Sequence, residues 1–326
     1  MKNNRGISLI EIIAVIGIFG IIAYIATQSF VALIRKQRLD AMKKAEELFL
    51  IAAENYVLDN PVLLPSENNK SVVVKLETLI ELGLIKPIQD QFSEAKETCW
   101  EHLSYAKITK LRENKYDYKV NLVCPNYITD ALQFMLQHSL IGEIGDMEEA
   151  NSSGNAKGWN IGWNPNQKSL STEQKFSGKK SQYLSYPDDA THTNDYGGMT
   201  YNLGANLINV NHIYYLVGYV YRDERAKGTI GINLYNHTKS QTNMTPTGNV
   251  VPNHWTRTST WIDLKTRPTY SLNDTFYLYF YLNMSGGVRE FAGYMDSVAI
   301  IDLTELFGAS NEPSKEVLDS WLQNSN

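Results

Sequence analysis

The chain begins with a long apolar stretch that a short basic segment precedes. Residues 1–6 contain Lys2 and Arg5, and residues 7–34 are mostly apolar. About 20 helical residues span roughly 30 Å of hydrocarbon, so residues 7–34 predict a membrane-spanning helix. The only charged residue in this stretch is Glu11. Burial of a single carboxylate in lipid is unfavourable in free energy, so Glu11 is expected to pair with another polar or charged group.

The helical pattern continues beyond the apolar stretch. Apolar residues there recur at spacings of three and four, as in an amphipathic helix; they are Leu39, Met42, Ala45, Leu48, Phe49, Ala52, Ala53, Tyr56 and Val57. Asn60-Pro61 ends the pattern. The sequence thus predicts one helix over residues 7–58, whose second half packs on a globular part. A coiled coil is the alternative, but the heptads are interrupted and strand-like sequence follows.

Short elements follow the long helix. Residues 72–74 read as extended, and residues 76–83 read as a short helix that Gly83 closes. Residues 104–109 and 115–124 alternate apolar and polar side chains, as half-buried strands do. The first module, residues 7–127, is therefore predicted to be α+β, with a long N-terminal helix and a small antiparallel sheet.

The chain has two cysteines, Cys99 and Cys124. The wide spacing of these two cysteines does not match the ligand spacing of a zinc site, and no C-x-x-C motif is present. Outside the membrane, a disulfide between them is the expected state. The alternative is a pair of unrelated buried thiols.

Gly6, Ile7 and Glu11 resemble the class III leader of type IV pilins and pseudopilins. In that family, prepilin peptidase cuts after the Gly, and a Glu five residues into the mature chain pairs with a neighbouring subunit's new amine. The resemblance implies cleavage of residues 1–6, filament assembly through Glu11, and other pilin subunits and the peptidase as partners. It also implies a single-pass membrane protein that becomes extracellular in a pilus on a bacterial surface. A signal peptide or plain anchor is the alternative, but the apolar stretch is too long for an ordinary signal peptide.

The pattern changes near residue 144. Five of the six Trp and fourteen of the twenty Tyr residues follow residue 150, in short alternating runs that Gly, Asn, Pro and Asp separate. These runs predict an all-β sandwich over residues 144–326, with a short C-terminal helix, and residues 128–143 as a linker. The clearest strands are residues 181–185, 214–222, 229–236, 275–283 and 293–301.

Alternation separates an aliphatic face from a face rich in Tyr and Asn. Sugar rings stack on aromatic rings, and amides bind sugar hydroxyl groups, so the second face predicts glycan binding. The candidate glycan-binding residues are Tyr215, Tyr219, Tyr221, Asn233, Tyr235, Trp255, Tyr277, Tyr279 and Tyr281, with Trp163, His192 and Arg257 at the rim. Tyr also favours strands, so a half-exposed face that binds no ligand is the alternative.

Several short motifs resemble the jelly-roll carbohydrate-binding modules. They lie at residues 144–148, at Trp159-Asn160, and at residues 178–184 and 294–300. A concanavalin-like sandwich is the alternative fold. The resemblance implies glycans or glycoproteins as partners. It also implies a candidate structural calcium, whose hard oxygen ligands would come from Asp146, Glu148, the main chain of Lys179, and Asp296. The alternative is that these acids are solvated at strand ends.

Composition narrows the functional classes. The net charge of -5 and pI of about 5.7 do not favour direct nucleic-acid binding. No P-loop, G-x-S-x-G, H-E-x-x-H or dinucleotide motif is present, so no enzyme is predicted. The sequence predicts a minor pilin that presents a glycan-binding module for adhesion. The alternatives are a pseudopilin of a secretion or DNA-uptake system with a protein-binding β module, and a membrane-anchored glycoside hydrolase that uses acids such as Asp188, Asp189 and Glu290.

Overall fold

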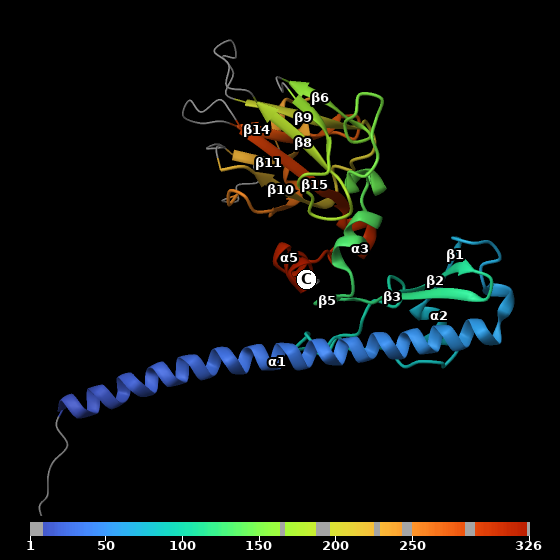
Figure 1. The fold of residues 1–326 in the computed structure, drawn as a ribbon, viewed down its shortest axis with the longest axis vertical. Helices are drawn as coiled ribbons and strands as arrows, with labels where there is room; N and C mark the ends of the chain where they lie inside the picture. Colours follow the sequence, from blue (N-terminus) through green and yellow to red (C-terminus); the bar gives the residue numbers. More distant parts are fainter. Residues whose placement is uncertain are drawn as a thin grey trace, which may run out of the picture. The chain divides into compact units, whose positions relative to one another are not determined.

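The computed structural model describes residues 9–163, 167–186, 196–224, 229–242, 250–283 and 291–324. The chain forms two compact units, Met1–Thr129 and Asp130–Asn326 (Figure 1). Within the segment predicted as a linker, α3 (Ala131–Gln137) buries Phe134 and Met135 and contacts β15 (Phe291–Asp302) of the second unit. Most of residues 128–143 is therefore part of the second unit.

The first unit is built on α1 (Leu9–Asp59), the long blue helix of Figure 1. It ends directly before Asn60-Pro61, as expected, and η1 (Pro61–Leu63) follows. Its C-terminal half fully buries Met42, Phe49, Ala53 and Val57, which confirms the predicted amphipathic face. The prediction for Leu48 is wrong, because this side chain is 62% exposed. Neighbouring helical residues lie about 100° apart, so Leu48 faces away while Phe49 faces inward.

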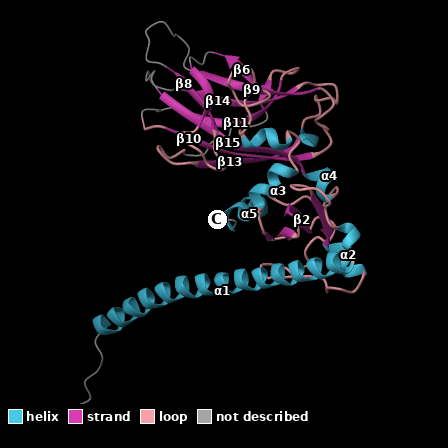
Figure 2. Cartoon of the chain, turned by 45° about the vertical axis from the view of Figure 1, so that its right-hand side comes forward, coloured by secondary structure: helices cyan, strands magenta, loops and turns pink. Residues whose placement is uncertain are grey.

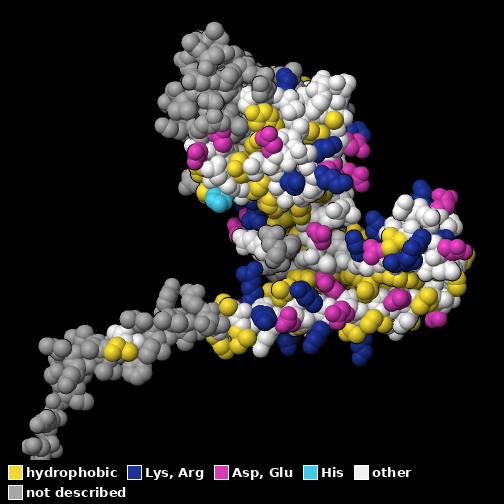
Figure 3. Space-filling view, viewed as in Figure 1, with side chains coloured by type: hydrophobic (Ala, Val, Ile, Leu, Met, Phe, Trp, Pro, Cys, Tyr) yellow, Lys and Arg dark blue, Asp and Glu magenta, His cyan; other side chains and the backbone are white. Residues whose placement is uncertain are grey.

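Apolar side chains also remain exposed along α1. Among the described side chains in its N-terminal half, Ile18, Phe30, Val31 and Leu33 are all more than half exposed. In Figure 3, hydrophobic side chains lie beside Lys, Arg, Asp and Glu along the described part of this helix. No helix of the described residues has both the length and the apolar character that crossing a membrane requires. Residues 1–8 of the predicted leader and anchor lie outside the described residues, as do most side chains of residues 9–29.

A small antiparallel sheet packs against α1, as predicted. Its strands, in the order β1-β2-β3, are β1 (Ser71–Lys75), β2 (Tyr105–Arg112) and β3 (Lys115–Asn121). The helix α2 (Leu76–Glu81) follows β1 and contributes Leu76 and Leu79 to the same core. Gly83 closes this helical turn with φ +70°, a conformation that L side chains rarely adopt. The hairpin of β4 (Val123–Cys124) and β5 (Tyr127–Ile128) ends the unit.

The predicted disulfide is present. Cys99 and Cys124 are bonded, are buried, and are 25 residues apart in sequence. The bond joins the segment after α2 to β4, within the core that α1 covers.

Removal of this disulfide should destabilise the first unit. By closing a loop of this length, the disulfide lowers the entropy of the unfolded chain, which raises the free energy of unfolding by about 3 kcal/mol in the chain-entropy model. We expect the Cys99→Ala/Cys124→Ala variant to lose about that much protection from amide hydrogen exchange in β2 and β3. Exchange in the second unit serves as the internal control and should not change. Unchanged protection of β2 and β3 would contradict this prediction.

The second unit is a sandwich of two five-stranded antiparallel sheets (Figure 2). The β15 sheet has the order β13-β10-β15-β8-β7, and the β14 sheet has the order β12-β11-β14-β9-β6. The strands are β6 (Trp159–Trp163), β7 (Gln167–Ser171), β8 (Ser181–Tyr186), β9 (Tyr196–Gly204), β10 (Ile213–Arg222), β11 (Thr229–Asn236), β12 (Gln241–Thr242), β13 (Thr256–Asp263), β14 (Phe276–Asn283) and β15 (Phe291–Asp302). From β8 to β11, and from β13 to β15, the chain passes to the other sheet at every step, as in a jelly roll.

The core lies between the two sheets. It contains the aliphatic faces that alternation predicted, including Ile230, Ile232 and Leu234 of β11. Gly218 of β10 faces the opposite sheet, because a Cβ atom there would lie 2.3 Å from Cδ1 of Ile232. This glycine therefore allows the sheets to approach each other closely at their centre.

Helices cover part of the outer face of the β15 sheet. The expected C-terminal helix is α5 (Lys315–Asn324), which buries Leu318 and Trp321. Asp319 of α5 accepts hydrogen bonds from Tyr215 (2.7 Å) and Ser259 (2.6 Å), on strands β10 and β13. The remaining short elements of this unit are η2 (Gly142–Asp146), η3 (Leu264–Thr266) and α4 (Leu303–Phe307).

Candidate functional site

The outer face of the β14 sheet brings together five of the predicted glycan-binding residues. Tyr277, Tyr279 and Tyr281 alternate along β14 with the core residues Phe276, Leu278 and Phe280, which have no exposed surface. On β11, Asn233 pairs with Tyr279 and Tyr235 pairs with Tyr277. We call Asn233, Tyr235, Tyr277, Tyr279 and Tyr281 the tyrosine face.

The rings of the tyrosine face form a continuous group. The ring centroids of Tyr235 and Tyr279 are 4.6 Å apart, and those of Tyr277 and Tyr279 are 6.2 Å apart, in both cases with planes inclined by 25°. The His237 ring lies 4.8 Å from that of Tyr277 and extends the group past the end of β11. Burial, followed by the neighbouring Tyr235 and Tyr277, raises the pKa of Tyr279 to about 12. The phenol is neutral at physiological pH, as an unshifted tyrosine also is, so it keeps its hydroxyl proton.

Two polar atoms of the tyrosine face are buried and make no hydrogen bond of normal geometry among the described residues. They are Oδ1 of Asn233 and the hydroxyl oxygen of Tyr281. Burial raises the pKa of Tyr281, and hydrogen bonding with the Asn233 side chain opposes that rise, so the two side chains also interact with each other. A buried polar atom left without a partner costs about 1–3 kcal/mol. Water or a ligand that satisfies both atoms would remove this cost.

The β14 sheet is also uncharged. None of its five strands contains Asp, Glu, Lys or Arg. The β15 sheet differs, since it carries Lys168, Arg222, Arg257 and Asp296, among others. The tyrosine face is therefore a neutral surface of aromatic, amide and hydroxyl groups.

The other predicted glycan-binding residues lie on the outer face of the β15 sheet. Tyr215 is fully buried and donates to Asp319 of α5, and Tyr219 is 6% exposed with its ring stacked on Phe176 at 3.5 Å. Both predictions are corrected, because these side chains are covered and cannot contact a ligand. Tyr221 of β10 and Trp255, which directly precedes β13, are partly exposed, and their ring centroids lie 5.7 Å apart, at the β15 sheet rather than at the tyrosine face.

Two of the carboxylates predicted to bind calcium accept hydrogen bonds from a surface loop. Glu148 Oε1 accepts hydrogen bonds from the main-chain N–H groups of Lys179 (2.6 Å) and Lys180 (3.1 Å). Gly178 makes this approach possible, because a Cβ atom there would lie 2.0 Å from Glu148 Oε1. Lys179 thus offers Glu148 an N–H donor, whereas the calcium prediction required its carbonyl oxygen.

Asp296 holds the same loop from β15. Its Oδ2 atom accepts hydrogen bonds from the main-chain N–H groups of Phe176 (2.8 Å) and Ser177 (3.1 Å). Among the described residues, no group of three or more His, Cys, Asp and Glu side chains could hold a metal. Because N–H donors point at both carboxylates, Asp146, Glu148, Lys179 and Asp296 do not fit calcium as a set of oxygen ligands. Calcium binding remains an untested prediction.

Asp296 should make the second unit's stability depend on pH. Burial raises its pKa from 3.8 to about 7, although the hydrogen bonds from Ser177, Phe176 and Ser297 oppose the rise. Between about pH 4 and about pH 7, the folded state therefore binds a proton that the unfolded chain has released. Stability should fall as pH rises through this window, by at most about 1.4 kcal/mol per pH unit.

The Asp296→Asn variant isolates this effect. Its amide oxygen can still accept the two N–H groups, but it does not titrate. Urea unfolding of the second unit from about pH 5 to about pH 7 should show a flatter pH dependence in the variant than in the wild type. Equal slopes would show that Asp296 is ionised throughout this window.

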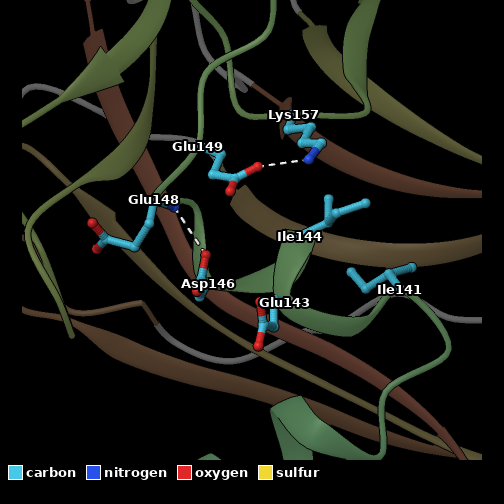
Figure 4. Close-up of a pocket in the computed structure, with 7 residues that line it drawn as sticks. All are labelled: Ile141, Glu143, Ile144, Asp146, Glu148, Glu149 and Lys157. Carbon is cyan, nitrogen blue, oxygen red and sulfur yellow. Dashed lines mark hydrogen bonds and ion pairs between the residues drawn. The ribbon is translucent and has the colours of Figure 1, made fainter. Parts of the chain in front are cut away.

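A cavity of about 400 Å³ lies beside these carboxylates (Figure 4). Glu143, Asp146, Glu148 and Glu149 line it, together with Lys157, Ile141 and Ile144. Lys157 Nζ lies 2.6 Å from Glu149 Oε2. Burial, followed by the nearby Glu148, Glu143 and Glu149, raises the pKa of Asp146, and the N–H of Glu148 opposes the rise. Nothing in the cavity identifies a ligand, so we assign it no function.

Some predicted site residues lie outside the described part of the chain. These are Gly6, Ile7, His192, Asp188, Asp189 and Glu290, together with the side chains of Glu11 and Trp163. Arg257 is described, and it donates to the main-chain oxygen of Asp319 (3.1 Å), so it anchors α5.

Sequence reasoning missed the neighbours of the tyrosine face. Thr200 of β9 pairs with Tyr279, and Asn160 of β6 pairs in turn with Thr200. Gly231 and Gly198 flank Tyr281 on the two adjacent strands. The alternation in β9 was a usable signal for Thr200, but the strand order that places β9 beside β14 is not visible in the sequence.

Comparisons with known proteins give only weak structural likenesses. No protein-family model matches the chain, and no curated protein sequence matches it. The CBM22-1 xylan-binding domain of Paenibacillus barcinonensis Xyn10C is 15% identical with a TM-score of 0.35, over 51% of this chain and 91% of that domain. A xylan-binding domain of family CBM 22 is 16% identical with a TM-score of 0.32, over 48% of this chain and 95% of that domain. The Stig cyclase Fisc of Fischerella sp. TAU is 12% identical with a TM-score of 0.37, over 48% of this chain and 93% of that protein.

Likeness at this level does not define a ligand or an activity. The fold and the site define a two-unit chain, in which a long helix with a small sheet precedes a β-sandwich that carries an uncharged tyrosine face.

Proposed function

We propose that the second unit binds glycans through the tyrosine face. One observation carries this proposal. The buried oxygens of Asn233 and Tyr281 lack a hydrogen bond of normal geometry, and they lie beside a cluster of tyrosine rings. Aromatic rings supply contact area at low entropy cost, and phenol and amide groups suit sugar hydroxyls. The weak likeness to xylan-binding domains agrees with this choice, but the proposal does not depend on it.

We further propose that the chain is a minor subunit of a type IV pilus, which presents this unit for adhesion. The resemblance of Gly6, Ile7 and Glu11 to the pilin leader supports the assignment. So do the exposed apolar side chains of α1, such as Phe30, Val31 and Leu33, which a membrane or neighbouring helices would cover. The large second unit favours a low copy number, because repeated copies would crowd a thin filament.

A glycan array probed with the full chain in detergent tests the glycan proposal. Binding to at least one class of glycan, and its loss in a variant of the tyrosine face, is the expected result. If the array shows no binding while the same preparation retains its disulfide and fold, the glycan proposal is wrong. A pseudopilin with a protein-binding β unit would then be the better account.

A further inference from the structure

This inference rests on the glycan-binding function proposed above, and it concerns the part of the tyrosine face around Asn233 and Tyr281. We propose that these two residues form a polar anchor for a pair of sugar hydroxyl groups, and that the uncharged β14 sheet restricts the ligand to neutral glycans.

The strand register leaves room beside Tyr281. Tyr281 pairs with Gly231 on β11 and with Gly198 on β9, so neither adjacent strand places a side chain next to its ring. Asn233 is the next outward residue after Gly231 on β11, and it pairs with Tyr279. The amide of Asn233 and the hydroxyl of Tyr281 therefore lie on adjacent strands at one end of the group of rings.

The unsatisfied atoms define the chemistry of the missing partner. Asn233 Oδ1 can only accept a hydrogen bond, while the Tyr281 hydroxyl can donate one and accept one. Asn233 is 8% exposed, and Oδ1 makes no hydrogen bond of normal geometry among the described residues. A ligand with two adjacent hydroxyl groups satisfies both atoms, because each sugar hydroxyl both donates and accepts.

The charge of the sheet sets the second part of the proposal. An anionic sugar needs a cation or several N–H donors to replace the water that it loses. The five strands of the β14 sheet carry no Lys or Arg. Lys239, in the turn before β12, lies 3.9 Å from Asp274, so its charge is already balanced. Among the described residues, the face therefore has the groups that a neutral sugar needs and lacks those that a uronate or sialate needs.

Tyr281→Phe is the sharpest test, because it removes one oxygen atom and keeps the ring. The full chain in detergent is titrated calorimetrically with xylohexaose, cellohexaose and mannohexaose, and with hexagalacturonate as the anionic probe. We expect at least one neutral probe to bind, hexagalacturonate not to bind, and Tyr281→Phe to weaken the neutral interaction about tenfold. Asn233→Ala should weaken it to a similar extent. Tyr183→Phe is the matched control, because Tyr183 is a partly exposed strand tyrosine of the other sheet.

Stability of the ligand-free protein separates an anchor from a structural role. Because the Tyr281 hydroxyl makes no hydrogen bond of normal geometry among the described residues, and interacts only weakly with the Asn233 side chain, its loss should leave the melting temperature nearly unchanged or raise it. A lowered melting temperature with unchanged affinity would overturn the anchor.

Three binding results would contradict the proposals, and each contradicts a different part. Wild-type affinity in Tyr281→Phe would overturn the anchor but leave the tyrosine face as a glycan site. Binding of hexagalacturonate as tight as that of the neutral probes would overturn the charge selection. Failure of the wild-type chain to bind any sugar, on the array or by calorimetry, would overturn the glycan function itself.

Discussion

Tyr279→Ala is expected to weaken glycan binding by about 30-fold, which corresponds to the loss of about 2 kcal/mol typical of a central aromatic contact. Tyr279 lies between its neighbours in the group of rings, with centroids 4.6 Å from Tyr235 and 6.2 Å from Tyr277. Its removal takes away contact area and also breaks the continuity of the other two rings. Calorimetric titration of the full chain with the best ligand from the array measures this loss.

The control for this prediction is Tyr183→Ala. Tyr183 is also a partly exposed strand tyrosine in contact with another ring, since its centroid lies 5.1 Å from that of Tyr294. It belongs to the β15 sheet, so its removal should not change glycan affinity. Equal losses in the two variants would show that tyrosine removal acts through general destabilisation. A loss confined to Tyr183→Ala would move the site to the other sheet, beside Tyr221 and Trp255.

Glu11→Ala is expected to lower incorporation of the chain into pili by at least about tenfold, because it would leave the neighbouring subunit's amine buried among helices without its carboxylate partner. In the proposed assembly, Glu11 pairs with the amine that cleavage before Ile7 creates on a neighbouring subunit. Alanine removes this pairing but keeps the helix. Quantitative immunoblotting of sheared pili against total cell protein measures incorporation.

Glu47→Ala is the matched control for Glu11→Ala. Glu47 is an exposed acid in the C-terminal half of the same helix, and its replacement should leave incorporation unchanged. Normal incorporation of Glu11→Ala would contradict the pilin assignment. So would pili that contain the chain with residues 1–6 still attached.

Local pattern predicted the elements of this protein well. The strand expected at residues 229–236 is β11, and its alternation placed Ile230 and Ile232 in the core. The end of α1 also followed from the sequence, because proline restricts the residue before it. These features depend on neighbouring residues, whose effects a sequence pattern records directly.

The choice among tyrosine rows could not be made from the sequence. Tyr215 and Tyr219 alternate along β10 as Tyr277 and Tyr279 do along β14, yet only the second pair reaches the surface. The difference arises from distant segments, since Asp319 of α5 is 104 residues from Tyr215, and Phe176 comes from the loop before β8. No local period reveals which sheet face a later helix will cover.

The carboxylates show the same limit. Asp146, Glu148 and Asp296 have the side-chain chemistry of calcium ligands, but main-chain N–H groups donate hydrogen bonds to one oxygen of Glu148 and to one oxygen of Asp296. Whether a loop presents N–H or C=O groups to an acid depends on its backbone conformation, including the positive φ of Gly178. The sequence identifies the acids but not the groups that face them.

A crystal structure of the full chain with its best-bound neutral oligosaccharide tests the central claim most directly. The account predicts a sugar over Tyr235, Tyr277 and Tyr279, with two hydroxyl groups within hydrogen-bond distance of Asn233 Oδ1 and the Tyr281 oxygen. A sugar bound instead at Tyr221 and Trp255, or in the acidic cavity beside Lys157, would contradict it.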